Sequence, residues 1–436
     1  MYPSFSPSRF SSMLPSFPPS PTPPSVPPSL TPLIWKQVGH DINGGSASDQ
    51  LGHSTSFSAD GMTLAIGAIG NNGYVRVYRK KDNVLNWAQL GQTINGEGDR
   101  FGWSLSLSAD GNTLAIGAPF NSDNGVSKSG QVIVYNMDVD GSSWKQLGQI
   151  INGIAIDDKY GWSVSLSGYG TILAVGAYRS DGNGANSGHV MVYQKEEGNS
   201  VSWSQMGQPI YGEESNDQAG VSVALSASGN TLAIGANGND GNGRESGQVR
   251  IFSWDYAVLD YKQFGESIDG EASCDWSGYS VALSADGNTV AIGSRFNPGG
   301  SGRCNDKKEY NSGYVRVYHW GDYGISWEQR GGDIDGEAAP VNYSGQHVAL
   351  SDNGLTLAIG APRYGELPGY ARVYRWNFEW GAPTQLGQTM AGNVTSLPYS
   401  GISVSLSGDG NTLAIGAPGS DGDGDDSGQV QVFNIE

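Results

Sequence analysis

The hexapeptide Thr113-Leu-Ala-Ile-Gly-Ala118 occurs seven times, unchanged or in a close variant, in this 436-residue chain. Its glycine stands at Gly67, Gly117, Gly176, Gly235, Gly293, Gly360 and Gly416. The copies follow one another at intervals of 50 to 67 residues, longer than the repeats of helical solenoids. Intervals of this length are typical of β-propeller blades, so the repeat predicts an all-β, seven-bladed propeller.

Each copy contains four strand-like runs, which the second copy shows at 102–108, 113–118, 131–135 and 144–152. Asp110-Gly111 separates the first two runs and is a strong hairpin signal. In the first run, large side chains alternate with serines, so neither face of the strand is charged. A strand packed between two neighbours needs this pattern, so we expect four-stranded antiparallel blades arranged in a ring.

The two ends of the repeat array indicate how the ring closes. The array opens with a lone fourth run, Trp35-Lys-Gln-Val-Gly-His-Asp-Ile-Asn43, and the last copy, 401–433, lacks that run. We therefore expect the N-terminal run to supply the outer strand of the last blade. The propeller then spans residues 33–436.

Residues 1–32 have a different composition, because 11 of the 20 prolines lie there among serines. Proline removes backbone donors and restricts φ, so we expect a disordered linker or stalk. The first ten residues lack the apolar core of a secretory signal. We expect either another route of export or a fragment that lacks its true start.

Charge and hydropathy narrow the classes of partner. The formal net charge is −19, which disfavours nucleic acid as a partner. No run of about 18 apolar residues is present, so we expect no direct membrane insertion. We expect a monomeric propeller.

Two short motifs relate the repeats to a known family. The second copy carries Phe101-Gly102 and Gly117-Ala118-Pro119, and Gly-Ala-Pro returns at 360–362 and 416–418. Residues 33–436 thus resemble the FG-GAP repeats of the integrin α-subunit propeller and related surface proteins. The resemblance implies the propeller fold and a role in adhesion, although propellers serve many functions.

One feature of that family is missing from this sequence. FG-GAP blades often carry an Asp-x-Asp-x-Asp-Gly calcium loop in the hairpin between their first two strands. Here these hairpins read Ser-Ala-Asp-Gly-Asn-Thr or close variants, which are too short and offer too few oxygens to enclose calcium. The calcium positions of the family therefore do not carry over.

Most of the long loops lie at one end of the predicted propeller. These are the loops between the second and third strands (B–C) and those leading to the next blade (D–A), and acidic residues outnumber basic ones in them. This acidic rim is the candidate binding face. One B–C loop contains Asp421, Asp423, Asp425 and Asp426, a candidate calcium site. The alternative is that these aspartates only form turns.

Aromatic residues and histidines fall into recurring and non-recurring groups. Tryptophans recur in the fourth runs at Trp35, Trp87, Trp144, Trp203 and Trp327, which indicates blade architecture. Trp276 and Tyr178 lie in loops and do not recur, so they are candidate ligand contacts. His53 and His347 lie in first runs, where we expect packed or channel-lining side chains.

Three further features point to the cell exterior. Cys274 and Cys304 lie in two loops of one blade and at the same rim, so they predict either a disulfide or two surface thiols. The sequons at Asn342 and Asn393 are candidate N-glycosylation sites. Together with the proline-rich stalk, these features predict an extracellular or cell-surface protein.

We interpret the chain as a non-catalytic binding or adhesion module that recognises a protein or a glycan through its acidic rim. We expect no catalytic residue and no required cofactor, with calcium as a candidate ligand. The alternatives are a propeller hydrolase or lyase acting on polysaccharide with rim carboxylates, and a structural cell-wall or matrix protein. Several non-repeating carboxylates or histidines converging at the channel mouth would favour the enzyme.

Overall fold

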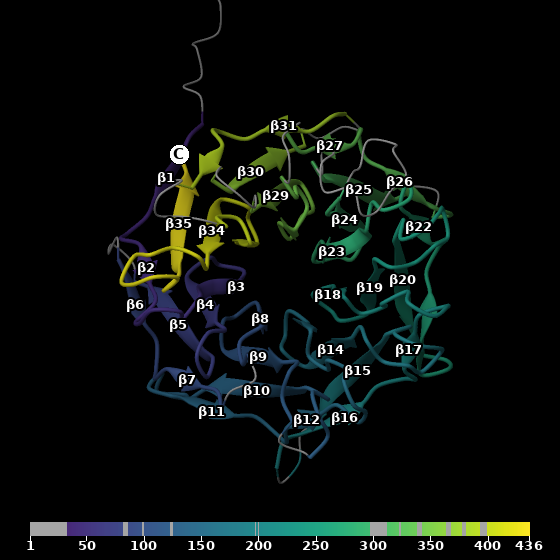
Figure 1. Ribbon diagram of the computed structural model, residues 1–436, viewed down its shortest axis with the longest axis horizontal. Helices are drawn as coiled ribbons and strands as arrows, with labels where there is room; N and C mark the ends of the chain where they lie inside the picture. The colour runs from purple at the N-terminus through teal and green to yellow at the C-terminus, as the bar shows by residue number, and fades with distance from the viewer. Residues whose placement is uncertain are drawn as a thin grey trace, which may run out of the picture. The chain divides into compact units, whose positions relative to one another are not determined.

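The computed structural model describes residues 33–81, 86–97, 100–122, 125–196, 198, 200–296, 312–321, 324–337, 342–362, 368–376, 381–392 and 399–436. These residues form seven antiparallel sheets around a common axis and contain no helix (Figure 1). None of the described residues therefore belongs to a helix able to cross a membrane. The predicted seven-bladed propeller is confirmed. The predicted linker, residues 1–32, lies outside the described residues.

Blade 2 shows the plan of every blade. Its strands are β8 (Ser104–Leu107), β9 (Thr113–Ala118), β10 (Gln131–Met137), β11 (Trp144–Gln146) and β12 (Ile151–Asn152). The first three form an antiparallel meander, and β11 and β12 both pair with β10. The predicted fourth run, 144–152, is thus one outer strand broken in two around Gly148, which has φ 79°. Each blade therefore has four strand positions.

The other blades repeat this plan. Blade 1 contains β3 (Leu51–Phe57), β4 (Thr63–Ala68), β5 (Tyr74–Lys80), β6 (Trp87–Gln89) and β7 (Ile94–Asn95). Blade 3 contains β13 (Ser163–Leu166), β14 (Ile172–Ala177), β15 (His189–Glu196), β16 (Ser202–Gln205) and β17 (Ile210–Tyr211). Blade 4 contains β18 (Ser222–Leu225), β19 (Thr231–Ala236), β20 (Gln248–Asp255), β21 (Asp260–Gln263) and β22 (Ile268–Asp269).

Blade 5 contains β23 (Ser277–Leu283), β24 (Thr289–Ser294), β25 (Tyr314–Trp320), β26 (Trp327–Gln329) and β27 (Ile334–Asp335). Blade 6 contains β28 (His347–Leu350), β29 (Thr356–Ala361), β30 (Tyr370–Arg375), β31 (Thr384–Gln385) and β32 (Met390–Ala391). Blade 7 contains β33 (Ser403–Leu406), β34 (Thr412–Ala417) and β35 (Gln429–Ile435), and its outer strand is β1 (Trp35–Gln37) with β2 (Ile42–Asn43).

The ring closes as predicted. β1 and β2 pair antiparallel with β35, with Trp35 opposite Ile435 and Ile42 opposite Val430. Figure 1 shows these N-terminal strands beside β35, purple against yellow. Trp35 is only 3% exposed, and its Nε1 donates to the backbone oxygen of Leu386 in blade 6 at 2.8 Å. The N-terminal run therefore joins the last blade and also contacts the blade before it.

Four of the five recurring tryptophans donate a hydrogen bond to the preceding blade, whereas the buried Nε1 of Trp87 has no partner in the described chain. Trp144 Nε1 donates to the backbone oxygen of Leu90 in the preceding blade at 3.0 Å. Trp203 and Trp327 make the equivalent bonds to Leu147 and Phe264. These side chains are part of the inter-blade packing at the outer strands.

The repeated glycine of Thr-Leu-Ala-Ile-Gly-Ala is required by contact between blades. A Cβ at Gly235 would lie 2.0 Å from the backbone oxygen of Gly278 in the next blade. The equivalent distance is 2.0 to 2.3 Å at all seven copies, far closer than a real Cβ can approach. Gly278 itself has φ +82°, a conformation that favours glycine. Each blade thus meets the next backbone to backbone near the axis.

A serine hydrogen bond accompanies this contact in six of the seven interfaces. Ser222 Oγ, for example, donates to the backbone oxygen of Gly278 at 2.7 Å. The equivalent donors are Ser54, Ser104, Ser163, Ser280 and Ser403. Blade 6 has His347 in the place of this serine. The interface between blades 6 and 7 therefore lacks the serine bond.

The opposite end of the axis carries a closed ring of backbone hydrogen bonds. Ala59 N donates to Ala109 O at 2.9 Å, and the chain of bonds returns to Ala59 O from Gly408 N at 2.8 Å. The intermediate members are Gly168, Ala227, Ala285 and Asp352. We call this end, formed by residues 109–112 and their equivalents, the turn face. The loop face is the end formed by residues 119–130 and 153–160 and their equivalents.

Candidate functional site

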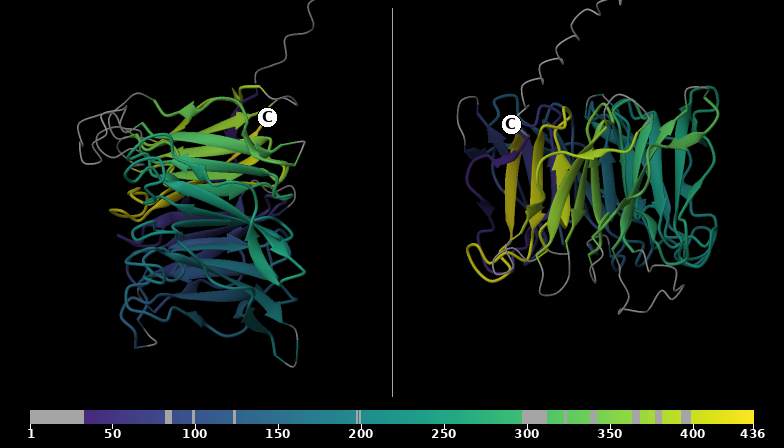
Figure 2. Two further views of the ribbon diagram at one scale, coloured as in Figure 1. Left: turned by 90° about the vertical axis from the view of Figure 1, so that its right-hand side faces the viewer. Right: turned by 90° about the horizontal axis from the view of Figure 1, so that it is seen from above.

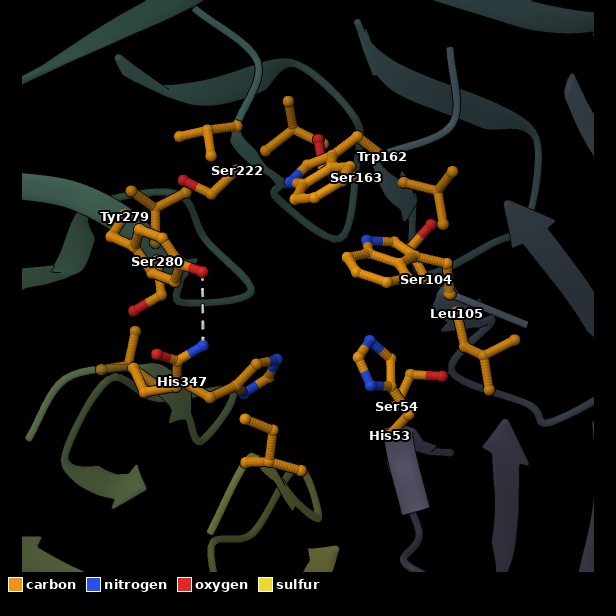
Figure 3. A pocket seen from close by; sticks show the side chains of 18 of the residues that line it. His53, Ser54, Ser104, Leu105, Trp162, Ser163, Ser222, Tyr279, Ser280 and His347 are labelled. Carbon is orange, nitrogen blue, oxygen red and sulfur yellow. Dashed lines mark hydrogen bonds between the residues drawn. The ribbon is translucent and has the colours of Figure 1, made fainter. Parts of the chain in front are cut away.

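A cavity of about 390 Å³ lies on the axis and is lined by the innermost strand of every blade (Figure 3). The strands run between the turn face and the loop face, as the side views in Figure 2 show. We call this cavity the axial pocket. All seven blades contribute side chains to this cavity, which makes it the candidate site.

In each repeat, the residue that directly follows the positive-φ glycine of the blade contact, such as Gly278, lines the axial pocket. These residues are His53, Trp103, Trp162, Val221, Tyr279, Gln346 and Ile402. The preceding glycines all have φ between +82° and +93°, so each blade presents the next side chain in the same way. The backbone frame repeats while the side chains on it differ. The alternation in 102–108 suggested that Trp103 packs on a neighbouring blade, but it lines the pocket instead.

Blades 1 to 3 form a continuous aromatic surface in and above the pocket. The ring of Trp103 lies 4.5 Å from that of His53 and 4.5 Å from that of Trp162. Tyr178, a ligand contact predicted from the sequence, lies 4.5 Å from Trp162. Phe120, in the B–C loop of blade 2, lies 5.6 Å from Trp103. Flat apolar rings that stay partly exposed suit a ligand with an apolar face.

A second aromatic group lies at blades 5 and 6. Trp276, the other predicted ligand contact, lies 4.6 Å from Phe296 and 6.3 Å from Tyr279, and Phe296 lies 5.3 Å from Tyr343. Trp276 Nε1 donates to Glu245 Oε2 at 3.1 Å. Trp276 also lines a separate polar cavity of about 310 Å³ on the loop face. It therefore lies between two cavities, and its contact with a ligand stays a prediction.

Positive charge accompanies both aromatic groups. The Arg100 guanidinium lies 4.7 Å from the ring centre of Phe120 and 5.4 Å from that of Trp103. Arg295 lines the axial pocket, and its guanidinium lies 4.9 Å from the ring centre of Tyr279. The described residues that line this pocket include no aspartate or glutamate. The acidic residues of the loop face thus lie outside a pocket whose lining combines serines, aliphatic and aromatic side chains with one arginine.

His53 and His347 point toward one another across the axial pocket (Figure 3). Burial, together with the nearby charge of Arg100 and with His347, lowers the pKa of His53 to about 4. Burial also lowers the pKa of His347 to about 4. Both rings are therefore neutral at pH 7. The expectation that these two histidines are packed or line the channel is confirmed.

The four aspartates of the blade 7 loop take part in the fold of that loop. Asp421 Oδ1 accepts the backbone N–H of Asp426 at 2.9 Å, and the backbone N–H of Asp423 donates to Ser427 Oγ at 3.1 Å. Asp425 is exposed. The described residues contain no group of three or more His, Cys, Asp or Glu side chains disposed to hold a metal ion. The loop does not gather its carboxylates, and calcium binding there stays a prediction.

The hairpin aspartates, which replace the calcium loops of the family, form turns. Asp110 Oδ1 accepts Ser108 Oγ at 2.5 Å and the backbone N–H of Asn112 at 3.0 Å. The same arrangement recurs at Asp286 and Asp409. These carboxylates therefore have a structural use at the turn face.

The covalent modifications predicted from the sequence lie partly outside the described residues. Cys274 is buried at 3% exposure, but Cys304 is not described, so the disulfide stays a prediction. Asn342 is fully buried, and its Nδ2 donates to Tyr370 Oη at 2.9 Å. A glycan on this nitrogen would displace that bond, which argues against glycosylation of the folded chain. Asn393 lies outside the described residues.

The sequence predicted Tyr178 and Trp276 as ligand contacts, which stays a prediction, and it did not single out Trp103, Trp162 and Arg295, which line the axial pocket. The signal for the two missed tryptophans was present in the repeats. When the seven copies are aligned on the positive-φ glycine of the blade contact, such as Gly102 or Gly161, the next position holds a different residue in nearly every copy. A variable position in an otherwise repetitive frame marks a site. Arg295 follows strand β24 and has no such signal.

Comparisons with known proteins support the repeat family and the fold. Residues 95–135, 152–193 and 385–433 match the family model of the FG-GAP repeat. No curated protein sequence matches the chain. Among solved structures, hydrazine synthase of Kuenenia stuttgartiensis is similar at 15% identity and TM-score 0.52, over 86% of this chain and 94% of that one. A putative 6-phosphogluconolactonase of Bacteroides uniformis is similar at 13% identity and TM-score 0.55, over 83% and 90%. At such identities the likeness concerns the fold alone.

Proposed function

We propose that this seven-bladed β-propeller, three segments of which match the FG-GAP repeat, is a non-catalytic binding module whose ligand enters the axial pocket from the loop face. The observation that carries this proposal is the aromatic surface made by His53, Trp103, Trp162 and Tyr178. The propeller scaffold does not require a ring at the position of His53, Trp103 and Trp162, since Val221 and Ile402 occupy this position in other blades.

A glycan suits the pocket better than a protein loop does. The C–H face of a sugar ring packs on a flat aromatic ring, and its hydroxyls need polar partners at the edge of that contact. Gln346, Arg295 and the two histidines supply such partners around the aromatic surface. A glycan bound here would reach outward over the loop face, where the acidic loops supply further contacts. We propose that the module acts in adhesion outside the cell.

The second class of function is an enzyme, and the observation that favours it is the convergence of His53 and His347. Proton transfer at neutral pH works best with a pKa near 7, whereas the pKa of each histidine lies at about 4. A hydrolase or lyase that uses rim carboxylates would also need them beside the bound sugar. The described lining of the axial pocket supplies none. Binding is therefore the better supported function.

The test is a glycan-array screen followed by calorimetric titration of the best glycan. Trp103→Ala and Trp162→Ala should each weaken binding by roughly tenfold, about 1.4 kcal/mol, because each removes a wall of the pocket. Tyr169→Ala is the matched control, since Tyr169 is an aromatic residue that is 81% exposed on the turn face. Equal affinity of both tryptophan variants and the original chain, with unchanged melting temperatures, would exclude the axial pocket as the site.

A further inference from the structure

We infer that the axial pocket selects an anionic glycan, and that Arg295 binds the carboxylate of an acidic sugar. This inference rests on the proposed function and specifies its ligand class. Arg295 lies directly after β24, at the start of the B–C loop of blade 5 on the loop face, and it lines the pocket. Its guanidinium is held over three rings, at 4.9 Å from Tyr279, 5.3 Å from Phe296 and 4.8 Å from Tyr343.

Arg295 differs from other arginines of the propeller in its partners. Arg250 and Arg316, on the third strands of blades 4 and 5, each lie 3.7 Å from a glutamate, Glu213 and Glu271 respectively. Arg295 has no acidic partner among the described residues, and its one hydrogen bond there is from Nη1 to Tyr279 Oη at 3.3 Å. Its buried Nε has no hydrogen-bond partner in the described chain. The charge of this side chain is thus held in place by the three rings, and no described residue neutralises it.

The other side of the pocket carries a second positive charge. Arg100 lies against Trp103 and Phe120 and forms no ion pair with a described residue. Its field reaches the pocket, because it contributes to the lowered pKa of His53. The whole chain has a net charge of −19, so this positive pocket departs from the character of the molecule. A cation in a partly desolvated cavity attracts an anion more strongly than an exposed one does.

The side chains that line the pocket favour a sugar acid over other anions. A guanidinium presents a planar pair of donors that matches a carboxylate. The aromatic walls accept the apolar face of a sugar ring, which an inorganic anion lacks. Gln346 Oε1 and His347 Nδ1 are buried without a hydrogen-bond partner in the described chain, so hydrogen-bonding capacity remains at blade 6. A cavity of about 390 Å³ has room for about one or two sugar rings.

The experiment compares each acidic oligosaccharide with its own methyl ester. The probes are trimers of galacturonic, glucuronic and mannuronic acid, each titrated into the full chain by calorimetry as the acid and as the ester. The ester keeps the shape of the sugar and removes the charge. We expect at least one acid to bind about tenfold more tightly than its ester. Equal binding of every acid and its ester overturns the inference.

Arg295→Gln identifies the residue responsible. This variant should lower the affinity for the preferred acid by about tenfold or more and change the affinity for the ester by less than about twofold. Arg179→Gln is the matched control, because Arg179 lies on the same face, pairs with Asp157 and does not line the pocket. Unchanged affinity of the Arg295→Gln variant for the acid, in a folded protein, overturns the inference.

The outcomes separate this inference from the proposed function. If neutral glycans bind and Trp103→Ala abolishes their binding while Arg295→Gln does not, the pocket is a glycan site without charge selection. If no glycan on the array and no probe binds, both proposals fail together. Added salt gives a further check, since about 0.5 M salt should weaken the binding of the acid more than the binding of the ester.

Discussion

The two ends of the propeller axis are built from the same seven repeats but differ in character. At the turn face, equivalent residues form one closed ring of backbone hydrogen bonds, and hairpin aspartates such as Asp110 form turns. At the loop-face end, the residue after the positive-φ glycine of each blade contact differs in nearly every blade and lines the axial pocket. The residues that repeat in every copy thus build the propeller scaffold, whereas the residues that differ between copies line the candidate site.

His347 shows that the two requirements compete at a single position. In six interfaces this position is a serine that bonds the next blade, as Ser222 does. In blade 6 it is a histidine that points into the pocket. At this position a pocket-lining histidine therefore stands in place of the serine that would form a hydrogen bond between two blades. The following predictions test the division between frame and site.

The largest effect should come from breaking the ring itself. Deletion of residues 33–43 removes β1 and β2 from blade 7 and should abolish a single cooperative unfolding transition, followed by circular dichroism. Trp35→Ala alone should cost about 3–5 kcal/mol, because Trp35 is buried between blades. Lys36→Ala is the control, since this side chain is 55% exposed and should change stability by less than about 0.5 kcal/mol. An unchanged melting temperature after the deletion would contradict closure.

A methyl group at a blade contact should have the next largest effect. Gly235→Ala should lower the free energy of unfolding by about 2–3 kcal/mol, because the new Cβ would overlap the backbone oxygen of Gly278. Gly332→Ala is the control, since nothing lies within 4 Å of its Cβ position. Guanidinium denaturation measures both. Equal stabilities of the two variants would show that blades do not need this close contact.

Acid should weaken the folded chain through the histidines of the site. The pKa of His53 and of His347 is about 4 in the folded chain, below the ordinary 6.5 of an exposed histidine. Between pH 6.5 and 4 the unfolded chain therefore binds more protons, and the free energy of unfolding falls as the pH falls. Replacing both with glutamine should remove on the order of 2 kcal/mol of this loss for each histidine. Denaturation at pH 7 and pH 4.5 measures it, and an unaltered pH dependence would be the contrary result.

The smallest effect should come from the serine bonds. Ser222→Ala should cost about 1 kcal/mol through loss of its buried bond to Gly278. His347→Ser should add about 1 kcal/mol by supplying the missing bond to Gly401 at the seventh interface. Ser46→Ala, at an exposed position, is the control. If His347→Ser lowers stability instead, the histidine contributes to the frame as well as to the pocket.

The repeats by themselves determined the number of blades, the strand order and the closure by the N-terminal run. Strand β9 begins and ends where its hexapeptide does, because strand periodicity and the Asp-Gly hairpin act over a few residues. The break of each outer strand was not predicted, since the glycine within it has no distinct local signal. The burial of Asn342 depends on packing against Tyr370, which lies in the next blade's third strand.

Only the closed ring determined the candidate site. Trp103 and Arg295 are far apart in the sequence, and they share a pocket because seven blades meet at one axis. The net charge of −19 is a property of the whole chain, whereas the charge inside the pocket depends only on the few side chains that line it. The local sequence pattern therefore determines the blades, whereas the arrangement of the seven blades around one axis determines which side chains contact a ligand.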